Sequence, residues 1–207
     1  SPGNFGNFEN VDISGYKWKD INGDGNWDTG ETGLDWKIYV GIDTDADGDA
    51  DSGIISTTAD TTTGYYEFTN LGPLTAGQQY VVYEDQTDIT SGEWTQTFGT
   101  AGYVIAATSG NTLAGVNGAG AEAAPADSAG NFGNFENVDI SGYKWEDDNG
   151  DSNWDNPAET GLDWEIYVGI DTNGDGDADS GIISTTADAT TGYYEFTNLG
   201  PLTAGQQ

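Results

Sequence analysis

The sequence predicts an all-β protein that contains two tandem β-sandwiches. Short stretches rich in Val, Ile, Thr, Tyr and Trp alternate with clusters of Gly, Asn and Asp, which is the pattern of strands and turns. No segment has a convincing apolar period of 3.6 residues, so helices are not expected to contribute. In addition, residues 1–18 return almost unchanged as residues 128–145, which makes the chain a duplication of one unit.

Seven strands are predicted in the first copy. They span residues 12–19, 35–42, 53–59, 64–69, 79–84, 94–98 and 102–107. Seven strands in about 100 residues are typical of a Greek-key sandwich of the immunoglobulin-like or prealbumin-like type. The second copy repeats this pattern as far as residue 207, and we therefore expect it to lack the C-terminal strands of the sandwich.

The charge balance excludes several classes of function. The chain has 36 Asp plus Glu against 4 Lys plus Arg, a formal net charge of −32, and it lacks His and Cys. Such a polyanion repels nucleic acid and anionic lipid. Without imidazole or thiol groups, the common general bases, nucleophiles and zinc ligands are missing, so we expect no enzyme. The 12% aromatic content still indicates a folded core, and no apolar run is long enough to span a membrane.

An acidic loop follows the first predicted strand and matches a calcium-binding pattern. Residues 20–31 fit D-x-[DN]-x-[DN]-G-x5-E at every specified position. Alternating side chains on a tight loop converge on one point, Gly25 allows the sharp turn, and Glu31 can close the ligand shell with two oxygens. The candidate ligands for Ca2+ are Asp20, Asn22, Asp24, Asn26, Asp28 and Glu31. The alternative is a solvated turn, because Asp, Asn and Gly are also the commonest turn residues.

Three further acidic loops are candidate cation sites. In the repeat of the first loop, Ser152 replaces Gly25 and the Glu stands one position later; its candidate ligands are Asp147, Asn149, Asp151, Asn153, Asp155 and Glu159. A second loop has the candidates Asp43, Asp45, Asp47, Asp49 and Asp51, and its repeat has Asp171, Asn173, Asp175, Asp177 and Asp179. These two lack the twelfth-position Glu, so another carboxylate or carbonyl must complete the shell, with Asp60 and Asp188 as candidates. Because clustered carboxylates repel one another, folding and Ca2+ binding should be linked.

The first copy resembles the B-type repeats of serine-aspartate-repeat surface proteins, the SdrD B-like family, which is related to Cna B-type surface-protein repeats. The resemblance rests on the motifs ISGYKWKDINGDGNWDTGETGLDWKIYV, STTADTTTGYYEFTNLGP and YVVYEDQ. It implies a calcium-stabilised, prealbumin-like sandwich that serves in tandem as a stalk or spacer in secreted or cell-wall-associated bacterial proteins. It also implies that the loop at 20–31 supplies the calcium ligands.

Similar repeats end in a strand with a Phe-Gly-Asn-Phe motif, which occurs twice here and sets the expected domain boundaries. We expect a closing or donor strand of a preceding unit at 1–10, repeat 1 at 11–107, a Gly/Ala-rich linker at 108–130, the closing strand of repeat 1 at 131–137 and the incomplete repeat 2 at 138–207. The linker contains one candidate edge strand, LAGV at 113–116. A spare strand before an incomplete domain predicts either a window of a longer array or subunits that complete one another head to tail.

One lysine admits a more specific chemistry. Cna B-type domains form isopeptide bonds between Lys and Asn with a carboxylate catalyst, and Lys17 with Glu84 supplies two of these three groups. The last predicted strand, 102–107, contains no Asn. We therefore expect that Lys17 packs its stem along the sandwich and keeps its amine in water.

The sequence thus predicts an extracellular structural repeat protein of the cell surface or of a secreted fibre, without catalytic activity. Its expected partner is another copy of itself, or a longer tandem array, and neither nucleic acid nor membrane insertion is expected. The alternative is an adhesive module for a host or cell-surface glycan or protein. That alternative requires a flat face of aromatic side chains, whereas alternating aromatics more often form a sandwich core.

Overall fold

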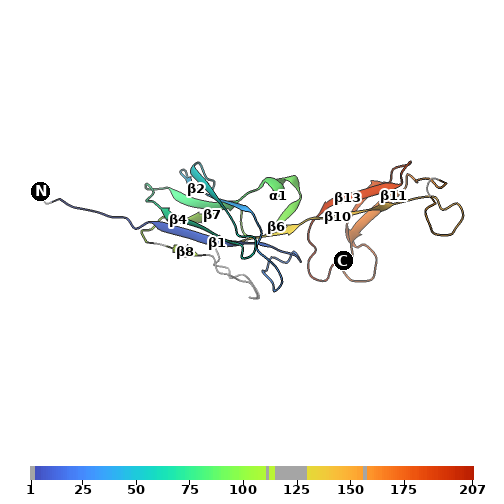
Figure 1. Cartoon of the computed structure of the whole chain (residues 1–207), viewed down its shortest axis with the longest axis horizontal. Helices are drawn as coiled ribbons and strands as arrows, with labels where there is room; N and C mark the ends of the chain where they lie inside the picture. The colour runs from blue at the N-terminus through green and yellow to red at the C-terminus, as the bar shows by residue number, and fades with distance from the viewer. Residues whose placement is uncertain (1–2, 111, 115–129, 156–157) are drawn as a thin grey trace. The chain divides into compact units, whose positions relative to one another are not determined.

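The computed structural model describes residues 3–110, 112–114, 130–155 and 158–207. The chain forms two compact units: unit 1 ends at Glu136 and unit 2 starts at Asn137 (Figure 1). The described residues are mostly strands and loops, so the predicted all-β class is confirmed. None of their helices is long and apolar enough to cross a membrane.

The first sheet of unit 1 is organised around β1 (Val11–Lys19). β4 (Tyr65–Leu71) pairs antiparallel with one edge of β1. β8 (Thr112–Ala114) and β9 (Phe132–Glu136) pair parallel with the other edge, one after the other along β1. β6 (Trp94–Phe98) pairs antiparallel with β9, which gives the order β4-β1-β9-β6. β9 therefore lies inside the sheet although a long segment separates it from the preceding strands in sequence.

The second sheet of unit 1 is antiparallel throughout, with the order β3-β2-β5-β7. Its strands are β2 (Lys37–Asp43), β3 (Ser52–Thr58), β5 (Gln79–Glu84) and β7 (Tyr103–Ile105). The loop between β2 and β3 is the second acidic loop of the sequence. A tight connection of this kind fixes both ends of the loop on neighbouring strands, so its side chains share one small volume.

The two sheets of unit 1 pack face to face over one apolar core. Alternate residues of both sheets fill it, namely Val11, Ile13, Ile38, Val40 and Val82, each at most 1% exposed. Alternation of this kind is what a period of two residues produces on a strand with one buried face. The predicted strands of the first copy agree with the observed ones to within two residues at either end.

One helix is not anticipated by the sequence pattern. α1 (Thr87–Ser91) follows β5, buries none of its residues and ends at Gly92, which has a left-handed φ of 86°. A five-residue helix is too short to display an apolar period, so a periodicity search misses it.

Unit 2 repeats half of the sandwich. β10 (Val138–Tyr143) pairs with β13 (Tyr193–Leu199), and β11 (Glu165–Ile170) pairs with β12 (Ser180–Thr186), in the registers of their counterparts in unit 1. Counterparts of β5, β6, β7 and β9 do not occur in the described part of unit 2. As a result Ile140 is 44% exposed, whereas the equivalent residue in the core of unit 1 is fully buried.

The same seven-residue sequence, NFGNFEN, occurs in two different environments. At 131–137 it forms β9, where Phe132 is completely buried. At 4–10 it forms no strand within its own chain, and Phe5 is 96% exposed. Tertiary contacts, not local propensity, therefore decide whether this segment is a strand.

Candidate metal centres

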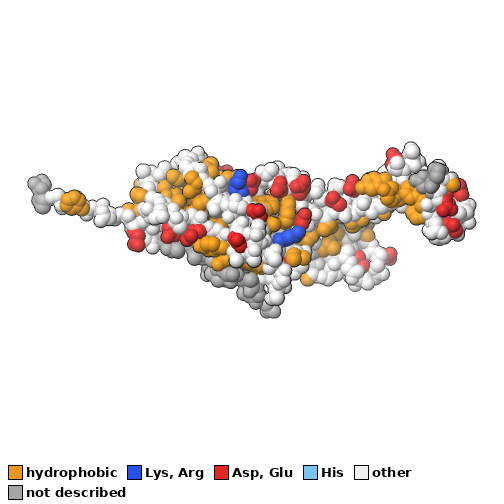
Figure 2. All heavy atoms as spheres, in the orientation of Figure 1, with side chains coloured by type: hydrophobic (Ala, Val, Ile, Leu, Met, Phe, Trp, Pro, Cys, Tyr) orange, Lys and Arg blue, Asp and Glu red, His pale blue; other side chains and the backbone are white. Residues whose placement is uncertain are grey.

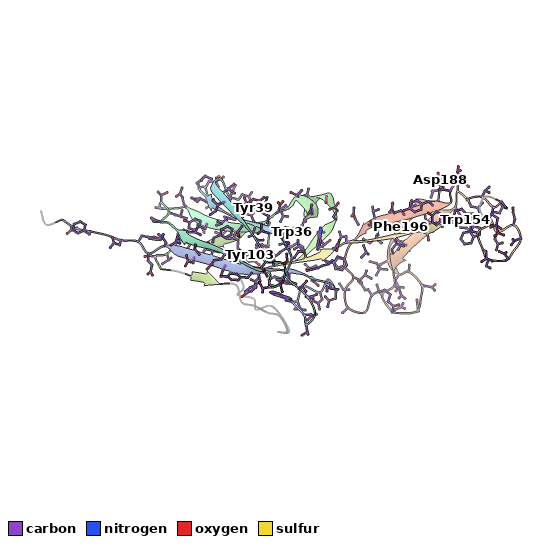
Figure 3. All side chains as sticks on the ribbon, in the orientation of Figure 1. Trp36, Tyr39, Tyr103, Trp154, Asp188 and Phe196 are labelled. Carbon is purple, nitrogen blue, oxygen red and sulfur yellow. The ribbon has the colours of Figure 1, made fainter. Side chains whose placement is uncertain are left out.

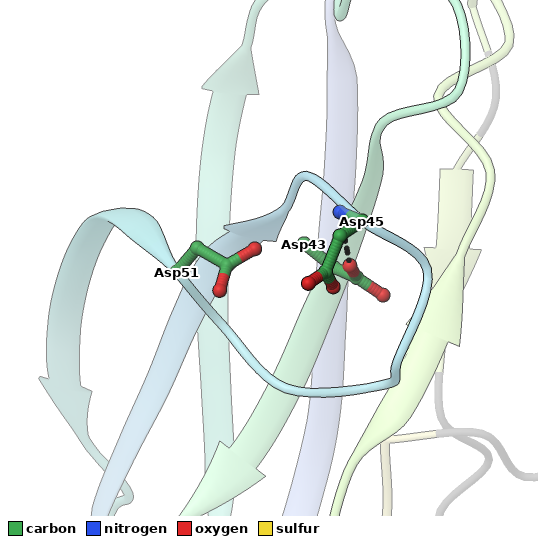
Figure 4. Close-up of side chains that lie close together, drawn as sticks. All are labelled: Asp43, Asp45 and Asp51. Carbon is green, nitrogen blue, oxygen red and sulfur yellow. Dashed lines mark hydrogen bonds between the residues drawn. The ribbon is translucent and has the colours of Figure 1, made fainter.

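Three carboxylates between β2 and β3 form the tightest acidic group of the described residues. Asp43, Asp45 and Asp51 each place one oxygen so that the three lie within 4.8 Å of one another. Figure 4 shows Asp43 and Asp45 close together, with the Asp51 carboxylate turned towards them from the arm that leads into β3. Clustered oxygen ligands without nitrogen or sulfur favour a hard cation such as Ca2+.

Asp43 holds this loop in shape from the end of β2. Its side chain is almost fully buried, and its two oxygens accept the N–H groups of Ala46 at 2.7 Å and Gly48 at 3.0 Å. Thr44 donates its N–H and its hydroxyl to one oxygen of Asp51, at 2.8 and 2.6 Å. The loop is thus wound around one carboxylate and closed by another, which keeps both sets of oxygens near its centre.

Repulsion within the group affects the pKa of Asp45. A hydrogen bond from the Asp47 N–H lowers this pKa, but the charges of Asp47, Asp51 and Asp43, together with desolvation, outweigh it and raise the pKa. The pKa of Asp51 is lowered instead, because the hydroxyl and N–H of Thr44 stabilise its charged form. A bound cation would relieve the repulsion at Asp45.

The remaining acids of this loop lie on its exposed rim. Asp47 accepts the N–H of Asp49 at 2.9 Å, and neither residue belongs to the three-carboxylate group. The sequence named all five acids of the loop as ligands, and the structure brings three of them together.

The repeat of this loop at 171–179 has the same hydrogen-bond pattern with one carboxylate fewer. Asp171 accepts the N–H of Gly176, and Thr172 donates to Asp179 as its counterpart does in unit 1. The N–H of Gly176, followed by those of neighbouring residues, lowers the pKa of Asp171. Asn173 replaces Asp45 and directs its amide nitrogen to Asp179 at 3.4 Å. The two remaining acids of this repeat are Asp175 and Asp177, and Asp175 accepts the N–H of Asp177.

The first acidic loop, residues 20–31, is closed by carboxylates at both ends. Asp20 is fully buried where β1 ends, and its two oxygens accept the N–H groups of two loop glycines at 2.7 Å each. Glu31 reaches back across the loop, and its oxygens accept the N–H groups of Ile21 at 2.7 Å and Asp28 at 2.8 Å. The first and twelfth residues of the motif thus face the same loop interior.

An amide bridges the carboxylates inside this loop. Asn22 Nδ2 donates to Asp24 at 3.2 Å and to Asp28 at 3.0 Å, while Asp24 accepts the N–H of Asn26 at 2.8 Å. The predicted ligands therefore gather in one place, but their carboxylates do not form a group as tight as that of the loop between β2 and β3. The amide nitrogen of Asn22 lies between the carboxylates of Asp24 and Asp28, where a cation bound by both would lie.

Burial and negative neighbours act together on Glu31. Desolvation raises its pKa, hydrogen bonds from the N–H groups of Asp28 and Ile21 oppose this, and the charges of Asp20 and Asp28 add to the rise. The net effect is a raised pKa, and a cation bound beside this carboxylate would oppose the rise.

The inserted residue in the second copy of the first loop leaves the role of the glutamate unchanged. Glu159 accepts the N–H groups of Asp148 and Asp155, both at 3.0 Å, as Glu31 does in unit 1. Asn149 again bridges two carboxylates of the loop. The other predicted ligands lie along the same turn: Asp147 accepts the N–H of Ser152, and Asp151 accepts that of Asn153.

Asp60 and Asp188, considered above as extra ligands, each accept hydrogen bonds within a turn. Asp60 accepts the N–H groups of Thr62 and Thr63 and the hydroxyl of Thr63, which lower its pKa, and Asp188 makes the equivalent bonds in unit 2. These carboxylates shape the approach to β4 and β13 and belong to no tight acidic group in the described residues.

The prediction for Lys17 is wrong. Its side chain is completely buried, and its amine lies 2.8 Å from the carboxylate of Glu84, which is also completely buried. From the sequence we named Lys17 and Glu84 together but predicted a solvated amine. That part failed because the two residues are buried by strands that lie far apart in the chain, which no local pattern reveals.

Comparisons with known proteins identify no family for this chain. No protein-family model matches the sequence, and no curated protein matches it either. Among solved structures, the chain is similar to the major pilin from Streptococcus pyogenes, with 12% sequence identity and a TM-score of 0.31. That match covers 96% of this chain and 76% of the pilin.

Proposed function

We propose that the chain is a calcium-stabilised structural repeat of an extracellular stalk or filament. The carrying observation is the group formed by Asp43, Asp45 and Asp51, whose oxygens converge within 4.8 Å in a loop that hydrogen bonds hold in shape. Each unit also has an equivalent pair of acidic loops at equivalent places. Figure 2 shows acidic side chains scattered over the visible surface with very few basic ones to pair with them.

The charge of the loops explains why a cation would stabilise the fold. Only four basic side chains are present against 36 acidic ones, so protein cations cannot neutralise the loops. In the unfolded chain the carboxylates separate and their repulsion falls. A divalent ion that binds the folded loop and not the unfolded one therefore adds its binding free energy to the stability.

Calcium dependence is tested by calorimetric titration and by thermal unfolding with and without excess EDTA. We expect EDTA to lower the melting temperature, and we expect Asp43→Asn and Asp51→Asn each to weaken Ca2+ binding about tenfold or more, since each removes a charged ligand. Glu67→Gln, which removes an exposed carboxylate from β4, is the matched control and should change neither quantity. An unchanged melting curve in EDTA would overturn the proposal.

The filament part of the proposal rests on the repeated NFGNFEN segment. Residues 4–10 have the sequence of β9 and stay outside every sheet of their own chain. β10, the counterpart of β1, has no parallel partner on its second edge within the described residues. We propose that residues 4–10 of one copy pair with residues 144–146, which directly follow β10, of the next copy, as β9 pairs with the equivalent end of β1, residues 17–19. This pairing joins copies head to tail.

The adhesive alternative has less support. Several of the aromatic residues that would form a glycan-binding face, namely Trp18, Trp27, Trp36 and Tyr66, are at most 7% exposed. They pack among themselves and against other rings in the interior of unit 1; Trp18 and Trp27, for instance, stack with their ring centres 5.4 Å apart. Their burial points to a core, as the alternating pattern predicts.

A further inference from the structure

The strand edge that holds β9 in unit 1 and the same edge in unit 2 differ at a single position. Residues 138–147 repeat residues 11–20 except that Glu146 replaces Lys19. The segment at 130–137, which contains β9, recurs without any change at 3–10. The contact within unit 1 and the proposed contact between copies are therefore built from the same residues, apart from one side chain whose charge is reversed.

In unit 1 this side chain attracts β9. Lys19 stands opposite Asn134 in the parallel ladder, and Glu136 lies two residues further along the same face of β9. The amine of Lys19 forms an ion pair with the carboxylate of Glu136, and it also lies 5.4 Å from the ring centre of Trp94 in β6. Both side chains of the ion pair are partly exposed, at 37% and 53%, so dissolved salt reaches them.

Hydrogen bonds to β9 fix the register that brings this pair together. The N–H of Tyr16 donates to Oδ1 of Asn131 at 3.0 Å, and the N–H of Asp20 donates to the carbonyl of Asn134 at 2.9 Å. One donor lies on either side of the residues that form the parallel ladder, so β9 cannot slide along β1 without losing both bonds.

Unit 2 repeats this edge and leaves it without a parallel partner. Ile140 stands opposite Phe196 of β13, which is labelled in Figure 3, as the equivalent residue of β1 stands opposite its partner in β4. On the other edge, no described residue pairs in parallel with β10 or with residues 144–146. Tyr143 and Asp147 place their N–H groups at the positions of the two register-setting donors of unit 1.

The segment at 4–10 carries the matching acceptors and one glutamate. Asn4 and Asn7 have the positions of the two acceptor residues of β9, so the same register sets Asn7 opposite Glu146. Glu9 then lies two residues further along the same face, as Glu136 does in unit 1. Glu9 and Glu146 are both exposed, and the N–H of Glu9 is held on its own unit by Ser109 at 2.9 Å.

We propose, on the basis of the head-to-tail contact proposed above, that Glu146 makes the junction between copies weaker than the contact it repeats and dependent on dissolved cations. Glu9 of one copy faces Glu146 of the next, where unit 1 has an attractive pair. The two carboxylates repel at low ionic strength, and salt screens the repulsion. The partner that this edge fits is a second copy of the chain.

The reversed charge also separates closing of unit 1 from joining of copies. Residues 4–10 have the sequence of β9 and would fit the edge of β1 as well, but that edge is attractive and holds the β9 of its own chain. A segment tethered in the same chain has a high effective concentration, so a second copy does not displace it. Low ionic strength therefore separates copies while unit 1 stays closed.

Sedimentation velocity of the full chain at saturating Ca2+, over a series of NaCl concentrations, tests the proposal. We expect Glu146→Lys to raise the association constant at low salt by roughly threefold to tenfold, because a cross-strand pair changes from like to opposite charge. Unit 1 already carries lysine at this position, so the variant is compatible with the fold. The difference should vanish near about 1 M salt, where the Debye length is about 3 Å.

Glu67→Lys is the matched control, because it makes the same change in net charge at an exposed position of β4, on the edge of β1 opposite to β9. Glu9→Lys should strengthen association as Glu146→Lys does. The double variant should fall back towards the wild type, because two lysines repel. Net charge alone cannot produce this reversal, since the double variant is the least negative of the set.

Two results would count against the proposal in distinguishable ways. Association that Phe5→Ala weakens, but that Glu146→Lys changes no more than Glu67→Lys, would overturn the role of Glu146 and leave the head-to-tail contact standing. A double variant that associates more strongly than either single variant would do the same. Chains that stay at 21.8 kDa in every variant and at every salt concentration would overturn both.

Discussion

At the residue scale, the backbone conformation of Gly25 limits which side chains can occupy that position of the first acidic loop. Its φ is 81°, in the left-handed region, and a side chain built on it would meet the carbonyl oxygen of Thr97 at 2.9 Å. Ser152 takes the same place in unit 2 with a φ of 65°, so the sequence itself makes the substitution there. The left-handed backbone is therefore less favourable at Ser152 in the second copy than at Gly25 in the first.

We expect Gly25→Ser to destabilise unit 1 by about 1–2 kcal/mol, from the left-handed backbone alone, with a further loss where the new side chain meets β6. Urea denaturation at saturating Ca2+ measures this difference. The control is Gly72→Ser, because Gly72 has no positive φ and open space around its Cα. Equal stabilities for the two variants would contradict the expectation.

Residue-scale prediction from sequence succeeds for groups whose partners are close in the chain. The acidic loops are of this kind: Asp43 shapes its loop through N–H groups no more than five residues away. Lys17 is of the opposite kind, since the groups that determine its environment are at positions 84 and 134. No local pattern encodes the burial of an amine by such distant residues.

At the scale of elements, β9 is the strand that most clearly depends on its surroundings. Its sequence also occurs at 4–10, where it forms no strand. The two copies thus provide a matched pair in which local sequence is constant and tertiary contacts differ.

We expect Phe132→Ala to destabilise unit 1 by about 3–5 kcal/mol, because the deletion leaves a cavity in a packed core. Phe132 is fully buried and contacts Tyr103 with ring centres 5.3 Å apart. Phe5→Ala removes the same side chain from the same local sequence at an exposed position, and in dilute solution it should leave stability unchanged. Chemical denaturation of both variants checks the prediction, which fails if the two losses are similar.

Most strands follow from the sequence because a stretch rich in β-branched and aromatic residues between turn residues is visible in a short window. β1 to β5 are examples, and β4 also alternates between exposed and buried residues from Tyr65 to Phe68. The pairing of β8 and β9 in parallel along one edge of β1 does not follow, because it depends on how a long intervening segment returns to the sheet. The helix α1 is missed because its five residues are too few to display an apolar period.

At the scale of the whole molecule, two units with one sequence pattern differ in how completely they enclose their apolar residues. Val138 and Ile140 of β10 are 49% and 44% exposed, and their counterparts in β1 are fully buried. A groove with a volume of about 390 Å³ lies beside them, lined by apolar residues of all four strands of unit 2. Exposed apolar surface of this kind favours association.

We expect the chain to form linear oligomers at high concentration through residues 4–10. Sedimentation and negative-stain imaging in Ca2+ measure assembly, and Phe5→Ala should reduce it, since β9 uses the equivalent Phe132 to anchor itself. Phe8→Ala is less suitable, because Phe8 packs against the core of its own unit. A discrete species of 21.8 kDa at all concentrations would contradict the expectation.

The parallel pairing of β1 and β9 has a mechanical consequence. Because the two strands run in the same direction, the start of β1 and the end of β9 lie at opposite ends of the pair. A pull on the chain before Val11 and after Glu136 therefore shears the pair and loads its bonds together, whereas an antiparallel hairpin would unzip one bond at a time. Unit 1 is accordingly arranged to bear tension along its length.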